Sequence, residues 1–149
     1  GGMCQFTNLI HWLVLHSPLE VVEHHHHDGI DMFPDFGRQV PFGVGTSIVY
    51  NYLDYRFKNT TAATYQLIIY TTPDYLCGEL RSDAQSNFSY HIKALDEFFS
   101  KESNGIYRNG QIIRNTVDKR NGNTVQSELI KTNHAKIQYD ASFVTEFLQ

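Results

Sequence analysis

One thiol and a run of four imidazoles are the residues of this chain best suited to chemistry. Cys4 follows two glycines and Met3 at the start of an apolar segment that predicts a helix. The first turn of a helix has unpaired backbone N–H groups and the positive end of the helix dipole, and both favour a thiolate over a thiol. The histidines at 24–27 stand between Glu23 and Asp28. Imidazole is the usual proton acceptor for a nucleophilic sulfur, so our leading hypothesis is a cysteine-dependent site.

The spacing leaves open which histidine serves the thiol. Side chains alternate along a strand, so His25 and His27 share one face, and His24 and His26 share the other. We predict that His25 or His27 is the general base. A carboxylate would orient its ring, and the candidates are Asp28, Asp31 and Glu23. Such a site suits acyl transfer or hydrolysis at an amide. The alternative is that Cys4 is a small buried residue beside a tight glycine turn.

The element that positions the thiol is predicted to be a helix from Cys4 to about His16. Its apolar face carries Phe6, Leu9, Ile10 and Leu13. A polar line runs along the same helix at helical spacing and consists of Cys4, Thr7, Asn8 and His11. Because His11 lies two turns from Cys4, roughly 10 Å along the axis, we expect it to make a buried hydrogen bond and not to touch the sulfur. Ser17-Pro18 should end the helix.

The rest of the chain has a β pattern. A strand is predicted from Leu19 to about His25, followed by an apolar, turn-rich loop over 28–45. Further strands are predicted at 46–51, 55–58, 64–71, 75–80, 88–95 and 105–117. The last is expected to be broken at Arg108-Asn109-Gly110, a strong two-residue hairpin signal. We therefore expect an α+β fold, with one buried N-terminal helix carrying the cysteine and then a mainly antiparallel β-sheet.

Composition narrows the function classes. The 149 residues are 41% hydrophobic, enough to bury a core within one domain. The formal charge is −4 and no basic stripe is present, so we expect no nucleic-acid partner. No apolar run approaches the roughly 20 residues that span a bilayer, so we expect no membrane span within this chain. The two cysteines, Cys4 and Cys77, are expected to stay reduced.

Metal binding and simple recognition are the rival functions. Imidazole is a preferred ligand of zinc, nickel and copper, but adjacent strand residues point to opposite faces. The histidine run therefore supplies at most two ligands, and Cys4, Asp28 or Asp31 would have to complete the set. We expect no metal and no cofactor. A non-enzymatic module would instead bind a peptide stem or glycan through aromatic residues of the β region, among them Tyr50, Tyr52, Tyr55 and Tyr70.

Several segments together closely resemble the VanW family. They are residues 1–5, Val21-Val22-Glu23 before the histidines, Phe33-Pro34-Asp35, Gly37-Arg38, Pro41-Phe42-Gly43 and residues 57–61. The resemblance is specific from Gly1 to about Arg81, and residues 107–109 and 133–139 are similar to a shorter, single-domain branch. The family is named for its association with vancomycin resistance clusters, and it also occurs in many other Gram-positive bacteria. It implies a setting in the bacterial cell envelope and peptidoglycan, without an established activity.

The resemblance also implies site residues. The family's glycine-cysteine-glutamine signature falls on Gly1, Gly2, Cys4 and Gln5, and its glutamate-to-histidine segment falls on Glu23, His25 and His27. We expect binding roles for Gly1, Gly2, Gln5, Glu23 and Arg38, and a cell-wall peptide or glycan as partner. His24 stands where the family usually has arginine, so a titratable group replaces a permanent cation.

The family further implies sequence N-terminal to Gly1. We therefore expect residues 1–149 to form a VanW-like domain that lacks its N-terminal part, with 82–149 as a structural or interaction region.

Overall fold

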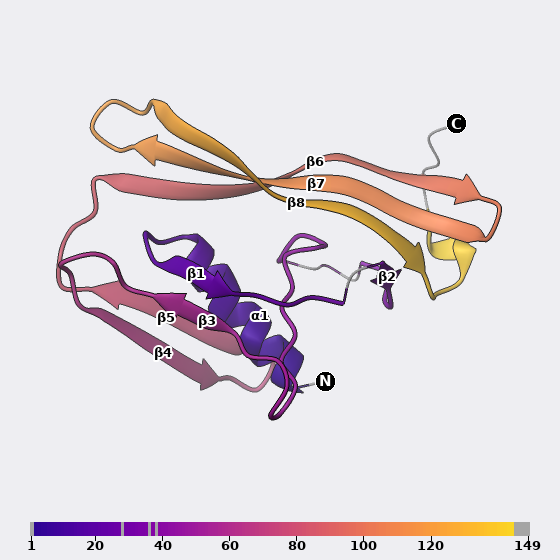
Figure 1. Cartoon of the computed structure of the whole chain (residues 1–149), viewed down its shortest axis with the longest axis horizontal. Helices are drawn as coiled ribbons and strands as arrows, with labels where there is room; N and C mark the ends of the chain where they lie inside the picture. Colours follow the sequence, from indigo (N-terminus) through magenta and orange to yellow (C-terminus); the bar gives the residue numbers. More distant parts are fainter. Residues whose placement is uncertain (1, 28, 36, 38, 145–149) are drawn as a thin grey trace.

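The computed structural model describes residues 2–27, 29–35, 37 and 39–144 of the chain (Figure 1). The elements are α1 (Gly2–Leu15), β1 (Glu20–Glu23), β2 (Ile30–Asp31), β3 (Arg56–Lys58), β4 (Tyr65–Thr71), β5 (Leu76–Ser82), β6 (Phe88–Glu102), β7 (Gly105–Asp118), β8 (Thr124–Ile137) and a 3-10 helix (Ala141–Phe143). Within the described residues the strands form three sheets, ordered β1-β3, β2-β8-β7-β6 and β4-β5.

The largest sheet is an antiparallel meander of three long strands, β6, β7 and β8, with one short addition. The β6–β7 pairing runs from Phe88 opposite Asp118 to Glu102 opposite Gly105. On the other side of β8, the two residues of β2 pair in parallel with Lys136 and Ile137. Residues 30–31, near the N-terminus, therefore complete a sheet whose other strands lie within residues 88–137.

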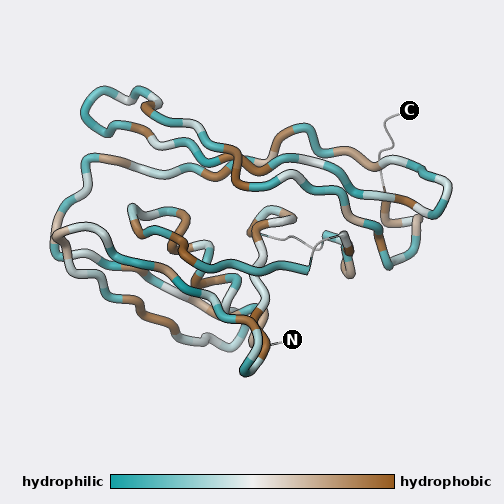
Figure 2. The backbone as a smooth tube through the Cα atoms, in the orientation of Figure 1, coloured by the Kyte–Doolittle hydropathy of each residue, from teal (hydrophilic) through white to brown (hydrophobic). Residues whose placement is uncertain are grey.

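The core lies where the end of α1 meets the middle of this long sheet. Leu15 of α1, Val44 of the following loop and Ile112 of β7 form a buried apolar cluster, with Trp12 and Ile92 packed against it. Figure 2 shows the same arrangement. Hydrophobic residues lie in α1 and at the centre of β6–β8, and hydrophilic residues lie in the loops at the ends of the long strands. Burial of these side chains is the main force that holds α1 against the sheet of β6, β7 and β8.

A second face of α1 packs on β5. A Cβ at Gly78 would come 2.9 Å from Leu13 Cδ1 and 3.2 Å from Leu9 Cδ2, so the missing side chain lets the helix approach the strand closely. The helix ends at Leu15, just before Ser17-Pro18 as expected, and the Ser17 hydroxyl donates to the Val14 carbonyl at 2.6 Å and accepts from the Leu19 N–H at 3.2 Å. Of the helices in the described part of the chain, none has the length and apolarity needed to cross a membrane.

The predicted α+β class is wrong, because the chain is mostly β, with 49% of residues in strands and 12% in helix. The helix is also not a buried one. Thr7, His11, Val14 and Leu15 are buried, whereas Met3 and Phe6 are 60% and 38% exposed. The β content exceeds the prediction because residues 124–137, for which no element is predicted, form the whole of β8.

Two local predictions are also wrong. Residues 46–51 do not form a strand, since they belong to a turn region in which Val49 makes an isolated bridge with Leu53. Asn109-Gly110 is not a hairpin turn, because β7 continues through it from Gly105 to Asp118.

Candidate functional site

The polar line of α1 holds the loop that faces it. Asn8 Oδ1 accepts a hydrogen bond from the Thr46 N–H at 2.7 Å, and Thr7 Oγ1 lies 3.5 Å from the Thr46 carbonyl oxygen. Thr46 Oγ1 donates to the His25 carbonyl at 3.2 Å, and the Ser47 N–H donates to the same oxygen at 2.6 Å. The histidine segment is thus tied through residues 46–47 to the turn of α1 that follows Cys4.

The histidines alternate in their contacts, as strand-like geometry predicts. His24 Nε2 donates to the Gly45 carbonyl at 2.8 Å, and the His24 ring stacks on His11. His26 packs against the same glycine, where a Cβ would come 2.5 Å from His26 Nε2, and its Nδ1 lies 3.1 Å from Lys131 Nζ. His24 and His26 therefore face the α1 and β8 side.

His11 makes the buried hydrogen bond that was predicted. It is 3% exposed, and its Nδ1 lies 2.9 Å from the Tyr55 hydroxyl. Burial, followed by the positive charge of His24 and His26, lowers the pKa of His11 to about 3. Burial also raises the pKa of Tyr55. Both partners are therefore neutral at physiological pH.

A histidine and a carboxylate are paired on β1 and just after it. His25 Nε2 lies 3.0 Å from Glu23 Oε1, and Arg56 Nη1 lies 3.6 Å from the other carboxylate oxygen, Oε2. The hydrogen bond from His25 is the main cause that lowers the pKa of Glu23. Since a carboxylate only accepts, Nε2 carries the proton and the neutral ring keeps Nδ1 as an acceptor. This is the arrangement of an oriented general base.

The thiol itself is accessible. Cys4 is exposed in the first turns of α1, and neither it nor the half-buried Cys77 of β5 forms a disulfide. The alternative that Cys4 is a small buried residue is therefore wrong. Gly2 and Gln5 are also exposed on α1. Among the contacts of the described residues, none joins the Cys4 thiol to a histidine ring.

Other predicted site residues lie elsewhere. Asp31 is 2% exposed, and its Oδ2 accepts from the Tyr139 hydroxyl at 2.8 Å and lies 3.6 Å from Arg108 Nη1. Its carboxylate therefore contacts an arginine and a tyrosine. His27 is exposed and lines a cavity beside β8. Three predicted site residues fall outside the described part of the chain: Gly1, Asp28 and Arg38.

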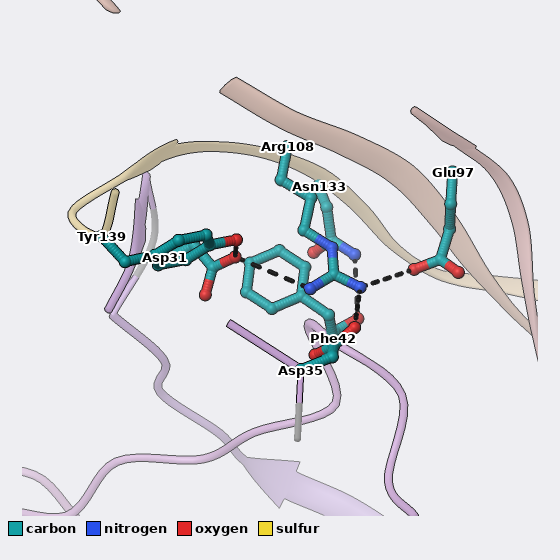
Figure 3. A network of polar contacts seen from close by, with 7 residues as sticks. All are labelled: Asp31, Asp35, Phe42, Glu97, Arg108, Asn133 and Tyr139. Atoms are coloured by element: carbon teal, nitrogen blue, oxygen red, sulfur yellow. Dashed lines mark hydrogen bonds and ion pairs between the residues drawn. The ribbon is translucent and has the colours of Figure 1, made fainter. Parts of the chain in front are cut away.

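Asp31 belongs to a buried charge network that sequence reasoning missed (Figure 3). Arg108 of β7 is 7% exposed, and its Nη2 donates to Asp35 Oδ2 at 2.7 Å and to Glu97 Oε1 at 3.2 Å. Its guanidinium also lies over the Phe42 ring, 4.5 Å from the centroid. Charge and hydrogen bonds from Asp35 contribute to raising the pKa of Arg108, against its burial. The network fastens the loop around β2 to the long sheet.

A signal for this network was present in the sequence. Asp35 and Arg108 both belong to segments that resemble the family, but Arg108 is part of the predicted turn Arg108-Asn109-Gly110, and a turn residue is not expected to hold a buried ion pair. In the residues that the structure describes, no group of three or more His, Cys, Asp or Glu side chains is placed to hold a metal ion.

Comparison with known proteins adds the wider context. The family described as VanW like protein matches residues 1–81. The chain is 31% identical over 139 residues to the vancomycin B-type resistance protein VanW of Enterococcus faecalis, an alignment that covers 93% of this chain and 50% of that protein. The chain therefore spans about half the length of the curated relative it matches. No solved structure gives a significant match.

Proposed function

This chain belongs to the VanW family, and from that premise we propose that it acts on a cell-wall peptide in the envelope of a bacterium with glycopeptide resistance, through acyl transfer or hydrolysis at an amide. Cys4 is the nucleophile, His25 is the general base and Glu23 orients the base. The observation that carries the proposal is the Glu23–His25 pair, with 3.0 Å between Oε1 and Nε2, on a segment tied to the helix that bears an exposed thiol.

The chemistry follows from the tautomer. Glu23 holds the proton on Nε2 of His25, so Nδ1 takes the proton of the Cys4 thiol. The thiolate adds to the amide carbonyl carbon, and the C–N bond breaks while His25 returns the proton to the leaving amine. The resulting thioester passes its acyl group to water in hydrolysis or to a second amine in transfer. The carboxylate also stabilises the positive charge that the imidazole carries between these steps.

The thiol and the imidazole do not touch in this structure, because His25 lies on the face of its segment opposite His24, whose ring stacks on His11 of α1. Catalytic hydrogen bonds are often long in unliganded enzymes and tighten in the substrate complex, so a separation at this stage is compatible with the proposal. The Thr46–Ser47 segment, bonded both to α1 and to the His25 carbonyl, is the connection through which a bound substrate would draw them together.

The test measures how the proposed base affects the thiol. Iodoacetamide labelling at pH 7 in the presence of a soluble cell-wall peptide, followed by mass spectrometry, gives separate rates for Cys4 and Cys77 in one sample. His25→Gln should slow the labelling of Cys4 about tenfold and leave Cys77 unchanged, because general-base assistance is worth at least that much. His91→Gln, which changes an exposed histidine of β6, is the matched control. A Cys4 rate that His25→Gln does not alter would remove the basis for the catalytic proposal.

One observation favours a second function, binding without catalysis. Tyr50 and Tyr52 are 96% and 83% exposed, although large aromatic side chains usually bury most of their surface. They stand on a tight turn in which Val49 pairs with Leu53 and Asn51 has a φ of 65°. Two exposed aromatic side chains on one turn are suited to stack on a sugar ring or a peptide stem.

The two functions give different results in a sedimentation assay with purified peptidoglycan. Under the binding function, the double variant Tyr50→Ala and Tyr52→Ala loses the sedimented fraction, whereas Tyr75→Ala, at a 66% exposed tyrosine before β5, retains it. Retention of binding by the double variant rules out the aromatic turn as the recognition surface.

A further inference from the structure

A pocket of about 350 Å³ lies where α1 ends, between the β4-β5 sheet and the sheet of β6, β7 and β8. Leu13 and Pro18 line it from the helix and from the turn after it, and Tyr65, Leu80 and Tyr90 line it from β4, β5 and β6. Its volume is at the small end of the range, roughly 300–1,000 Å³, that ligand sites occupy. The pocket therefore has room for one small ligand.

Strand alternation explains the wall that β6 provides. Ile92 of β6 packs against the apolar cluster that includes Leu15 of α1, and the β6–β7 register has no shift between residues 88 and 95. Phe88 and Tyr90 therefore share the face of Ile92 and point to the α1 side of the sheet.

The facing wall follows from the packing of α1 on β5. A Cβ at Gly78 would come 2.9 Å from Leu13 Cδ1, and Leu80 and Ser82 follow on the same face of β5. Tyr65 is opposite Ser82 in the β4–β5 pairing, so its side chain is on that face too. The helix fills the space between the two sheets only as far as its last turn, and the pocket is the space beyond it.

Two phenol hydroxyls at this pocket have no hydrogen-bond partner among the described residues. They belong to Tyr65 and Tyr90, which both line the pocket. No buried side-chain oxygen in the described part of the chain lacks a partner, so these two hydroxyls remain accessible to a ligand. Partial burial of the ring raises the pKa of Tyr90, Arg114 opposes this shift, and the neighbouring Tyr65 phenol adds to it. Tyr90 is therefore a neutral hydrogen-bond donor close to Tyr65.

Two further side chains of the pocket supply an acceptor and a donor. Nδ1 of His16 donates to the Trp12 carbonyl at 2.7 Å, so the neutral His16 ring keeps Nε2 as an acceptor. The Ser82 hydroxyl oxygen accepts from the Ala84 N–H at 3.2 Å, which leaves the hydroxyl proton for a ligand. Because His16 and Ser82 belong to different elements, the polar groups of the pocket can meet one ligand at several points.

Lys119 brings a positive charge to the pocket. It follows β7, and its backbone N–H donates to the Asn87 carbonyl at 2.8 Å, which fixes the main chain beside the start of β6. The carboxylate of Asp118 is engaged by Arg120 Nη2 at 2.7 Å. Among the residues that the structure describes, no Asp or Glu lines the pocket, and none pairs with the Lys119 ammonium group. This cation is thus available to an anion that a ligand brings.

We propose that this pocket binds a single sugar ring that carries a carboxylate. The carboxylate pairs with Lys119, hydroxyls of the ring meet Tyr65 and Tyr90, and the C–H face of the ring lies against Leu13 and Leu80. Apolar walls with a few convergent polar groups are typical of small-molecule sites, and aromatic side chains suit a ligand with one apolar and one polar side. A purely apolar ligand would bury these polar groups without partners, which costs free energy. This assignment does not depend on the proposed acyl transfer.

The test titrates four sugars into the ¹⁵N-labelled protein and follows the amides of Ser82, Ser89 and Lys119 by NMR. Glucuronic acid is paired with glucose, and N-acetylmuramic acid with N-acetylglucosamine, so each pair compares an acid with a neutral counterpart. We expect saturable shifts, and in at least one pair the acid should bind at least about tenfold more tightly. The pair that shows this preference tells where on the ring the acid group stands. The absence of saturable shifts with either acid up to about 10 mM, or equal affinities within both pairs, would overturn the proposal.

Two lysine variants test the charge. Lys119→Met should remove the preference for the acid over the neutral sugar, and Lys119→Arg should retain it. Lys93→Met, at an exposed lysine of β6, is the matched control and should bind like the parent protein. An unchanged preference in a folded Lys119→Met protein would contradict the assignment of the carboxylate to this lysine.

A tyrosine variant tests the hydroxyls separately from the charge. The double variant Tyr65→Phe and Tyr90→Phe keeps both rings and removes both hydroxyls, so the acid should bind at least about fivefold more weakly. Tyr75→Phe, at an exposed tyrosine before β5, is the control and should bind as the parent does. Parent-like affinity of the folded double variant would show that the two phenols do not contact the sugar.

Discussion

The imidazole rings of His11 and His24 are stacked, with centroids 4.4 Å apart and an angle of 21° between their planes. His11 belongs to α1 and His24 to the segment that follows β1, so the contact joins the helix to the histidine run. A charge on His11 would be buried and would lie beside His24 and His26. The folded protein therefore keeps the His11 ring neutral, with its pKa lowered to about 3.

The protein should consequently lose stability in mild acid. Between the ordinary histidine value of about 6.5 and the folded value of about 3, the unfolded chain binds a proton at His11 that the folded chain does not. The free energy of unfolding should fall with decreasing pH by up to about 1.4 kcal/mol per unit within this window. Urea unfolding at pH 7, 6, 5 and 4 measures the slope.

A variant assigns this slope to His11. His11→Gln has no titrating group but can still hydrogen-bond the Tyr55 hydroxyl, so the loss of stability between pH 6 and 4 should become smaller. His91→Gln, on the exposed face of β6, should leave the slope as it is. If the His11→Gln protein lost stability in acid as steeply as the parent, the buried imidazole would not be the source.

Arg108 should be among the most destabilising positions to change. Arg108→Met leaves Asp31, which is 2% exposed, without its cation, and removing one partner of a buried ion pair typically costs about 3–5 kcal/mol. The matched control is Arg81→Met, because Arg81 pairs with Glu79 on the surface and such pairs contribute about 0–1 kcal/mol. Chemical denaturation gives both values. Equal effects of the two substitutions would show that the Arg108 network adds little to stability.

The helix and several strands follow from the sequence because their signals are local. The helix α1 ends just before Ser17-Pro18, as predicted, and the strands predicted at 64–71 and 75–80 appear as β4 and β5. The hairpin predicted at Asn109-Gly110 is wrong, because the same residue pair can also mark an irregularity within one long strand. Gly110 lies in β7 opposite the bulge of β6 between Leu95 and Phe98, where a Cβ would come 3.2 Å from Glu97 Cγ and 3.4 Å from the Leu95 carbonyl oxygen.

The candidate site was predictable only in part. His25 and Glu23 lie two residues apart on the same face of an extended chain, so strand alternation predicts their contact. Arg108 and Asp35 are 73 residues apart in sequence, and only the tertiary fold brings them together. Side-chain exposure, which decides between a buried and an accessible Cys4, also depends on what packs on the helix.

Gly43 should be intolerant of a side chain for a reason specific to its position. Its φ is 91°, and a Cβ there would clash with the carboxamide of Asn133, which donates to the Phe42 carbonyl at 3.1 Å. Gly43→Ala should cost both backbone strain and this hydrogen bond, together about 2–4 kcal/mol. Gly122→Ala, with a φ of 73° and open space around it, isolates the strain alone and should cost about 1–2 kcal/mol. Thermal unfolding of both variants separates the two contributions, and equal losses would contradict the clash with Asn133.

Cys4→Ser is the substitution that best separates a chemical role of the thiol from a structural one. Because Cys4 is exposed, exchanging sulfur for oxygen should change the free energy of unfolding by less than about 0.5 kcal/mol. A serine hydroxyl is a far weaker nucleophile in the same geometry, so the proposed acyl transfer should be lost while folding persists. Cys77→Ser, at the half-buried thiol of β5, is the control and should lower stability while function declines only with the folded fraction. Melting temperature, measured together with vancomycin resistance of a strain that depends on the complete protein, reports both quantities, and full resistance from a normally stable Cys4→Ser protein would end the catalytic hypothesis.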